Sequence, residues 1–282
     1  MLIIDTHAHI YSPDEVRYPP IDNPLRPPGG KASVEDLRAV ARANGVDGAC
    51  LIQTSTFYRF DNRYTADAAR ANADWAVGVC TLDPDDPHSP GLLRQYVLES
   101  NVRGMRSIPA RDGRLAHPGV EALWRTALDL GIVINVLVGA DKAGEVEAML
   151  RKFPDLRVVL DHAMNLKAGP ELEATLAKVL SLARFENLYA KLTFIPTGSA
   201  TGYPCADMHE ACLRVVEAFG AERSVWGSNF PNRLWTPKVS YAEHLRIFRE
   251  LLPLGEAARR QILGQTANRL WFGGRLKDQD AV

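Results

Sequence analysis

The chain has 282 residues, 46% of them hydrophobic and 24% charged, which is the composition of a soluble globular protein with a large buried core. Its 33 Lys and Arg residues nearly balance 34 Asp and Glu residues, and the formal net charge of -1 excludes a global field that would attract nucleic acid or an anionic membrane. No apolar stretch approaches the roughly 20 residues needed to cross a bilayer, so we expect no membrane partner.

The start of the chain and its cysteines indicate a compartment. Met1 is followed at once by a strand-like run, which leaves no room for a secretory signal peptide. The four cysteines, at positions 50, 80, 205 and 212, lack the CxxC spacing of a metal site. We therefore expect a cytoplasmic protein with buried free thiols, and the sequence leaves the oligomeric state open.

Short apolar, β-branched runs alternate with longer amphipathic segments along the whole chain. The runs predict eight strands, over residues 2–10, 48–55, 76–82, 102–108, 132–138, 157–162, 188–194 and 224–230. The amphipathic segments predict helices over residues 33–44, 65–73, 118–130, 143–153, 170–183, 206–219 and 239–251. Strict alternation predicts a parallel sheet, and eight repeats predict one α/β domain over residues 1–282, a (β/α)₈ TIM-type barrel. The segment after Gly255 predicts extra C-terminal helices that cover the outside or the base.

In such a barrel the carboxyl ends of the strands meet at one face, where active sites are assembled. The chemically distinctive side chains of this chain fall at those ends. They are His7 and His9 on the first strand, Gln53 and Ser55 on the second, Arg103 and Arg106 on the fourth, His162 on the sixth, Lys191 and Thr193 on the seventh, and Asn229 on the eighth. Elements more than two hundred residues apart are thereby predicted to meet at one mouth.

Three histidines are the strongest sign of function. Alternation along a strand points His7 and His9 to the same side. Each ring alone is more readily explained as a hydrogen-bonded core histidine, but three at strand ends favour a site that includes His162. Three neutral nitrogens could hold one Zn²⁺ and leave a position open for water, or the imidazoles could carry protons without a metal.

The polar residues around the histidines predict a substrate-binding set. Arg103 and Arg106 stand three apart in a strand, so only one should enter the mouth, and a surface position is the alternative for each. An inward Lys191 needs an anion, either Asp161 or substrate, and Thr193 shares its face. Gln53 and Ser55 share a face in the same way. Asn62, Tyr203 and Trp235 lie in loops near the mouth, where binding and plain packing are equally good explanations.

Three ordered runs carry a resemblance to a known family. They are residues 5–9 (Asp-Thr-His-Ala-His), 160–162 (Leu-Asp-His) and 226–231 (Trp-Gly-Ser-Asn-Phe-Pro), supported by residues 103–106 (Arg-Gly-Met-Arg) and 266–270 (Thr-Ala-Asn-Arg-Leu). This set resembles the amidohydrolase superfamily, and in particular its lactonase-like branch of pyrone-dicarboxylate, sugar-lactone and muconolactone-type hydrolases. The resemblance implies hydrolysis of a small, anionic lactone, with Arg106 gripping a substrate carboxylate. It also implies that His7, His9, His162 and residue 229 are catalytic, with one divalent metal or none.

The chain departs from that branch at Asn229, where the branch has aspartate. A carboxamide is nearly isosteric with a carboxylate, but it is neutral and a very poor base. One explanation is an engineered Asp→Asn change that inactivates the enzyme. The other is a native Asn229, with a histidine or metal-bound hydroxide as the base, or with a barrel that binds without hydrolysing.

Other functions remain as alternatives or are excluded. A metal-dependent decarboxylase of the same superfamily and a non-catalytic ligand-binding barrel are the alternatives to a lactonase. The sequence contains no GxGxxG after the first strand, no GxxxxGK[ST] and no GxSxG, which excludes the corresponding phosphate cradles and the serine nucleophile elbow.

Overall fold

The computed structural model describes residues 1–277, and its sheet contains eight parallel strands in the order β1-β2-β3-β4-β5-β6-β7-β8. The strands span Ile4–Ala8, Gly48–Ile52, Ala76–Thr81, Val102–Ser107, Val133–Val136, Val158–Leu160, Leu188–Lys191 and Ser224–Val225. A parallel bridge between Ala8 and Phe230 links the segment after β8 to β1. The Asn229 N–H also donates to the His7 carbonyl at 2.9 Å. The predicted (β/α)₈ barrel is confirmed.

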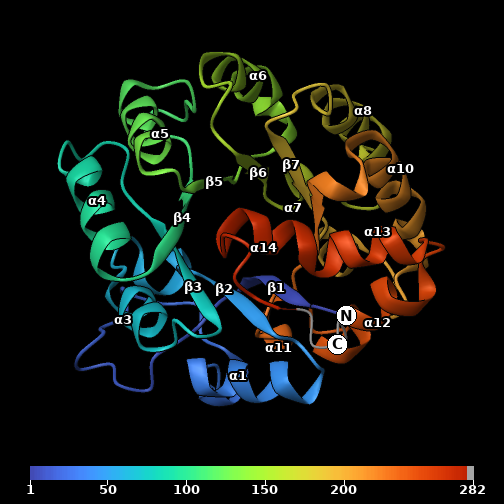
Figure 1. The fold of residues 1–282 in the computed structure, drawn as a ribbon, viewed down its shortest axis with the longest axis horizontal. Coiled ribbons are helices and arrows are strands. Elements are labelled where there is room, and N and C mark those ends of the chain that lie inside the picture. Colours follow the sequence, from blue (N-terminus) through green and yellow to red (C-terminus); the bar gives the residue numbers. More distant parts are fainter. Residues whose placement is uncertain (278–282) are drawn as a thin grey trace.

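Helices surround this barrel on the outside (Figure 1). The longer ones are α1 Val34–Ala43, α3 Arg63–Ala71, α4 Ser89–Glu99, α5 Pro118–Leu130, α6 Ala143–Lys152, α8 Leu172–Leu182 and α10 His209–Phe219. Short helices follow the carboxyl ends of β2, β6, β7 and β8: α2 Ser55–Tyr58, α7 His162–Asn165, α9 Phe194–Gly198 and α11 Asn232–Trp235. The chain ends with α12 Tyr241–Arg246, η5 Ile247–Leu251, α13 Glu256–Arg260, η6 Gln261–Gln265 and α14 Thr266–Trp271.

Helix α4 is the longer helix among residues 1–277 that lies outside the predicted helical segments. It begins with Ser-Pro-Gly, and its exposed Leu92 and Leu98 blur the apolar stripe that the buried Leu93 and Val97 form. Several strands are also shorter than predicted. The apolar runs continue past the last strand hydrogen bond into the loops that carry the site, so composition alone extends them.

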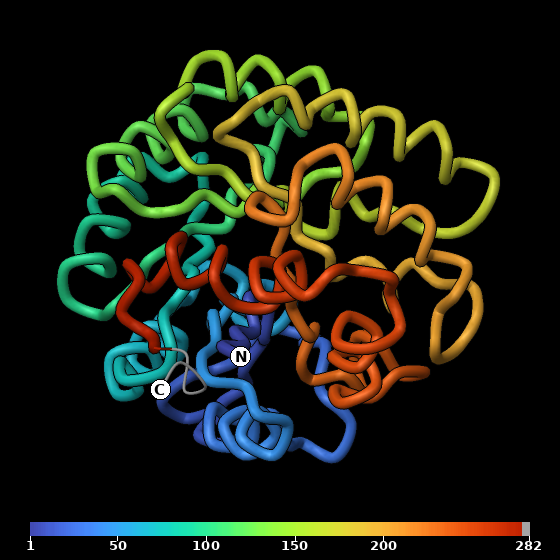
Figure 2. Tube along the Cα trace, turned by 45° about the vertical axis from the view of Figure 1, so that its right-hand side comes forward, coloured from blue at the N-terminus to red at the C-terminus, as the bar shows by residue number. Residues whose placement is uncertain are grey.

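The C-terminal helices close the base of the barrel. Helix α14 lies across the barrel end in both ribbon and tube views (Figures 1 and 2). Its Ala267, Leu270 and Trp271 form one buried cluster with inward-facing strand residues such as Ile4 and Val133. A second, larger cluster lies between the sheet and the surrounding helices. The prediction that these helices cover the base is confirmed, and the mouth is left as the open end.

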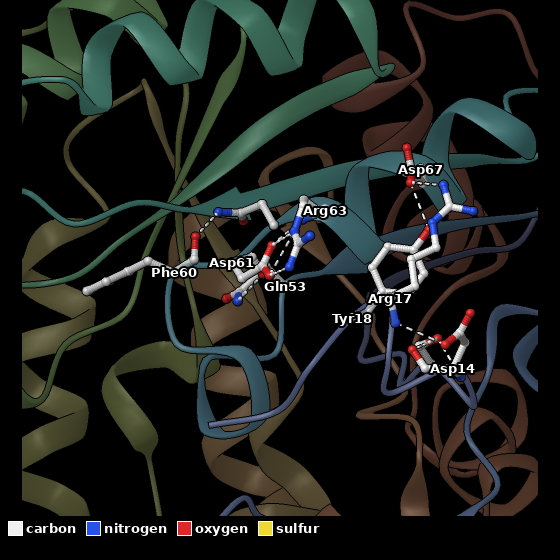
Figure 3. A network of polar contacts seen from close by, with 10 residues as sticks. Asp14, Arg17, Tyr18, Gln53, Phe60, Asp61, Arg63 and Asp67 are labelled. Carbon is white, nitrogen blue, oxygen red and sulfur yellow. Dashed lines mark hydrogen bonds and ion pairs between the residues drawn. The ribbon is translucent and has the colours of Figure 1, made fainter. Parts of the chain in front are cut away.

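The long loop between β1 and α1 is anchored to α3. The Tyr18 hydroxyl donates to Asp67 at 2.8 Å, and Arg17 pairs with the same carboxylate at 3.0 Å (Figure 3). A capping box starts α1, since the Ser33 side chain accepts from the Asp36 N–H and the Asp36 carboxylate accepts from the Ser33 N–H. These contacts hold the loop beside the mouth.

The four cysteines are buried and free, as predicted. Within residues 1–277, no helix has both the length and the apolar character needed to cross a bilayer.

Candidate functional site

A cavity of about 290 Å³ opens at the carboxyl ends of the strands. Its lining contains seven residues that the sequence singled out: His7, His9, Ser55, Arg106, His162, Asn229 and Trp235. The predicted convergence at the barrel mouth is therefore present in space. The chemical roles assigned to these residues remain predictions.

The three histidines lie in contact with one another. The ring centroids of His7 and His9 are 5.0 Å apart, and those of His7 and His162 are 4.6 Å apart. The Nδ1 atom of His9 lies 3.0 Å from the Ile52 carbonyl, which can only accept, so Nδ1 carries the proton and Nε2 is an acceptor. The Nδ1 atom of His162 lies 2.7 Å from the Thr193 hydroxyl.

A buried carboxylate organises the charges beneath the rings. Asp161 contacts the Lys191 ammonium at 2.8 Å, the Arg106 Nε at 3.2 Å and the Asn135 amide at 3.3 Å. Burial acts to raise the pKa of Asp161, but the adjacent Lys191 and Arg106 charges outweigh it and lower this pKa to about 2. Asp161 is therefore ionised at neutral pH. The pairing of Lys191 with Asp161 agrees with the first of the two partners predicted for that lysine.

His7 is wedged between the two cations of this cluster. Its Nε2 lies 2.9 Å from an Arg106 terminal nitrogen and its Nδ1 lies 3.4 Å from the Lys191 Nζ. Burial and then the Lys191 charge hold the pKa of His7 well below its usual value. Burial, followed by the Arg106 charge, does the same for His9. Burial also lowers the pKa of His162 to about 4, so all three imidazoles are neutral at pH 7.

The backbone adopts a rare conformation where it presents His162. Four consecutive residues, His162 to Asn165, have positive φ angles of 53°, 44°, 60° and 58°. Left-handed residues other than glycine cost about 1–2 kcal/mol each and normally occur singly. Such backbone strain clusters at functional sites.

Asn229 also has a positive φ, of 58°, and its side chain has a defined partner. The Asn229 Nδ2 donates to the Thr193 carbonyl at 2.8 Å. An aspartate in the same pose would place an anionic oxygen against that carbonyl, where no proton is available to bridge them. The contact therefore suits an amide and leaves Oδ1 as the acceptor of this side chain.

Asp5 supports the site from behind. It accepts hydrogen bonds from the Ser228 N–H (2.8 Å), the Ser228 hydroxyl (2.5 Å), the Tyr241 hydroxyl (3.0 Å) and the His7 N–H (3.0 Å). It thus binds the backbone of His7 and not the His7 ring. Burial raises the pKa of Asp5, although all four hydrogen bonds act to lower it.

Six predicted binding residues do not line the cavity: Gln53, Asn62, Arg103, Lys191, Thr193 and Tyr203. Gln53 donates to the Arg59 and Asp61 carbonyls and so anchors the loop after β2 (Figure 3). Asn62 is engaged with the backbone of Phe60 and Thr81.

Tyr203 precedes a cis proline in the loop after α9 and does not line the cavity. Arg103 is exposed at the opposite end of the barrel, as the alternation argument requires when Arg106 points inward. Gln53, Asn62, Tyr203 and Arg103 are therefore not among the side chains that the structure brings together at the cavity, and their binding roles stay predictions. Lys191 and Thr193 lie beneath the cavity. Lys191 contacts the His7 ring, and Thr193 contacts the His162 ring.

Five lining residues escaped the sequence argument: Thr54, Thr56, Leu137, Asn165 and Thr197. Strand alternation had placed Gln53 and Ser55 on the inner face. The strand ends at Ile52 and α2 begins at Ser55, so the period of two no longer applies there. Their one shared signal is a position within three residues of the carboxyl end of a predicted strand.

The donor set does not fit a divalent cation at His7. Both nitrogens of that ring face a positively charged group, so a metal on Nε2 would have to displace the Arg106 guanidinium. Within residues 1–277, no group of three or more His, Cys, Asp or Glu side chains is arranged to hold a metal ion. The predicted Zn²⁺ site of His7, His9 and His162 conflicts with this arrangement.

Two curated relatives act on lactones. The chain is 27% identical to an L-fucono-1,5-lactonase of Burkholderia ambifaria over 246 residues, which cover 85% of this chain and 82% of the relative. It is 25% identical to a D-galactarolactone isomerase of Agrobacterium fabrum over 277 residues, covering 95% and 90%.

Solved structures share the fold. A probable 2-pyrone-4,6-dicarboxylic acid hydrolase from Acinetobacter baumannii with citric acid bound has a TM-score of 0.82 at 18% identity, covering 96% of this chain and 100% of that one. An amidohydrolase from Burkholderia multivorans with bound zinc has a TM-score of 0.77 at 23% identity, covering 96% and 99%. A 5-carboxyvanillate decarboxylase from Sphingomonas paucimobilis has a TM-score of 0.68 at 17% identity, covering 96% and 99%.

The family follows from a match that spans almost the whole barrel. The model of the Amidohydrolase family matches residues 4–273, from the first strand to the end of the last helix. The resemblance carried by the histidine runs is confirmed. This chain belongs to the Amidohydrolase family.

Proposed function

We propose that this protein opens the ring of a small lactone that carries a carboxylate, by acyl transfer at the ester carbonyl. The observation that carries the proposal is the joint exposure of neutral imidazoles and one guanidinium to a cavity of about 290 Å³. A cavity of that size suits a monocyclic molecule. The two curated relatives, named for lactone substrates, support the same substrate class.

Arg106 binds the carboxylate of the substrate. Asp161 and His7 engage two of the five N–H groups of its guanidinium. The remaining N–H groups can form the bidentate pair that arginine makes with carboxylates. Because Asp161 holds the guanidinium from behind, it is oriented before the ligand arrives.

The imidazoles polarise the ester and move the proton. In this scheme the Thr193 hydroxyl, 2.7 Å from Nδ1 of His162, donates to that nitrogen, so that His162 presents Nε2–H to the ester carbonyl. His9, whose Nδ1–H is held by Ile52, presents an unprotonated Nε2 that takes the proton of the attacking group and returns it to the ring oxygen when the ester C–O bond breaks. Asn229 accepts a hydrogen bond from that group through Oδ1 and positions it.

The attacking group is water in a lactonase and a hydroxyl of the substrate itself in a lactone isomerase. Isomerisation is the second candidate, and Asn229 is the observation that favours it. An amide does not convert water to hydroxide, whereas a substrate hydroxyl held next to the carbonyl needs far less activation. The relative named as a D-galactarolactone isomerase is compatible with this second reaction.

No step of this scheme uses a resident metal, because a cation conflicts with the Arg106 and Lys191 charges at His7. The zinc bound in the Burkholderia multivorans structure belongs to a barrel with 23% identity, and only the fold is carried over from it. Elemental analysis of the purified protein tests this part of the proposal. A stoichiometric metal whose removal abolishes turnover would overturn it.

A panel of five- and six-membered sugar-acid lactones tests the reaction. Proton release in a pH-stat reports hydrolysis, NMR reports interconversion of ring sizes without proton release, and CO₂ release reports decarboxylation. Arg106→Gln should lower kcat/KM for carboxylated lactones by about 100-fold or more, while Arg111→Gln, which removes an exposed partner of Asp83, should leave it unchanged. Turnover that is indifferent to Arg106, or binding of the lactones without any turnover, would contradict the proposal.

A further inference from the structure

A second cavity, of about 300 Å³, lies at the base of the barrel, opposite the mouth. It is formed where the chain enters β5 and β6 and where α14 ends. Its lining consists of Arg103, Leu130, Gly131, Ile132, Arg157, Arg269, Leu270, Trp271, Phe272, Gly273 and Arg275. We refer to it as the basal cavity.

Four arginines, at positions 103, 157, 269 and 275, surround this cavity, and its lining contains no Asp or Glu. Their hydrogen-bond partners are neutral. Arg103 donates to the Asn101 side chain, Arg157 to the Gly131 carbonyl and Arg275 to the Ala73 carbonyl. Arg269 donates to the Gln261 side chain, the Thr266 hydroxyl and the Glu222 backbone carbonyl. None of the four is paired with a carboxylate among residues 1–277.

Two of these arginines, Arg103 and Arg275, lie close enough to repel one another. After burial, the charge of Arg103 is the cause that lowers the pKa of Arg275. Most arginines elsewhere on this surface have a carboxylate partner, for example Arg94 with Asp129 at 3.0 Å. An uncompensated group of four guanidiniums around a hollow is therefore a local exception in a chain whose net charge is only -1.

The floor of the basal cavity is apolar and aromatic. Trp271 is 2% exposed, and its indole N–H has no hydrogen-bond partner among residues 1–277. The Arg275 guanidinium lies 5.1 Å from the centre of the Phe272 ring, which holds that side chain over the floor. A ligand that fits this surface combines negatively charged oxygens with a carbon skeleton.

We propose that the basal cavity binds a small organic anion with at least two carboxylate or phosphate groups. Guanidiniums bind such groups through paired, charge-assisted hydrogen bonds, and the uncompensated charge supplies the attraction. The site is distinct from the mouth, since the packed interior of the barrel separates the two. It is independent of the proposed function, because no residue is shared by the two linings.

Calorimetric titration of the full chain with citrate, and separately with inorganic pyrophosphate, tests this proposal, with sodium chloride at matched ionic strength as the blank. The titration is made on the Arg106→Gln variant, so that binding at the mouth is removed. We expect one binding event, whose affinity falls at least tenfold in the additional Arg103→Gln, Arg157→Gln double variant. Arg94→Gln, which removes an exposed paired arginine, should change it less than twofold. The carboxylate and phosphate arms decide which oxyanion the site prefers.

The proposal is overturned if neither anion binds the Arg106→Gln protein, or if the double variant binds with unchanged affinity. Far-UV circular dichroism and thermal unfolding of each variant check that the fold is retained. Arg269→Gln provides an independent second variant, because its side chain reaches the cavity from α14 instead of from a strand. A loss of affinity in that variant supports the same site, and unchanged affinity in both variant proteins rejects it.

Discussion

The two ends of this barrel differ in whether their positively charged side chains are paired with a carboxylate. At the mouth, Arg106 and Lys191 are buried and share Asp161 as a partner, with neutral histidines beside them. At the base, four arginines lie mostly exposed around a hollow with no carboxylate among its lining residues. The difference teaches that burial requires an internal partner, whereas an exposed site can leave its charges for a ligand.

The largest expected effect comes from removing the partner at the mouth. Asp161→Asn leaves Lys191 and Arg106 buried without their anion, and we expect it to lower the free energy of unfolding by about 3–5 kcal/mol. Urea denaturation measures this change. Asp129→Asn, which breaks the half-exposed pair with Arg94, should cost less than about 1 kcal/mol. Equal losses of unfolding free energy in the two variants would contradict the proposed difference between buried and exposed charge pairs.

Lowering the pH should destabilise the mouth of the barrel before it affects the base. His162 and His244 both have pKa values lowered by burial to about 4, against about 6.5 in an unfolded chain. Between these values the unfolded state binds more protons than the folded state, so stability is present above about pH 6.5 and is lost as the pH falls toward 4.

The expected slope is about 1.4 kcal/mol per pH unit for each histidine that stays neutral on folding. Denaturation at a series of pH values measures it, and replacing His244 by Gln should reduce the slope. A stability that is flat between pH 6.5 and 4.5 would show that these rings are protonated in the folded protein.

A smaller effect comes from crowding His7 at the mouth. A Cβ added at Gly227 would lie 2.7 Å from the His7 Cβ and 2.8 Å from its backbone nitrogen. We expect Gly227→Ala to lower stability by about 1–3 kcal/mol and to reduce lactone turnover by displacing the ring. Gly91→Ala is the control, since a Cβ there meets nothing within 4 Å. Unchanged turnover in Gly227→Ala would remove His7 from the catalytic set.

The smallest effect is expected at the base. Arg103→Gln relieves repulsion with Arg275 and should change the free energy of unfolding by less than about 0.5 kcal/mol, in the stabilising direction. Arg214→Gln, which breaks an exposed pair with Glu173, should be neutral or slightly destabilising. A clear loss of stability in Arg103→Gln would mean that the basal arginines hold the fold together.

The regular part of this molecule could be predicted and the irregular part could not. Alternation of strand and helix patterns was sufficient for the barrel, and strand ends were sufficient to bring His7, His162 and Arg106 to one cavity. The predictions of side-chain position fail where the two-residue period of a strand ends. Gln53 lies one residue beyond β2 and turns into a loop, and Asn165 reaches the cavity through a left-handed run that no propensity predicts.

Asp161 shows a further limit of the sequence. Its identity as a partner of Lys191 could be inferred from the need of a buried ammonium for an anion. Its second partner, Arg106, could not, because that pairing depends on how three strands are spaced around the ring. The two-residue period of a strand predicts which side chains of that strand share a face. Predicting contacts between different strands of the barrel requires the geometry of the barrel.

The position of Asp5 has a consequence for how the protein is made. Its four hydrogen-bond donors include Ser228 and Tyr241, which a ribosome adds more than two hundred residues later. Until those residues are made, the Asp5 carboxylate is hydrated by water, and the His7 backbone gains its final support only when the segment after the last strand docks against the first. A chain truncated before residue 228 would lack two of the three residues that bind Asp5, so the two ends of the sequence must meet before the histidine cluster is complete.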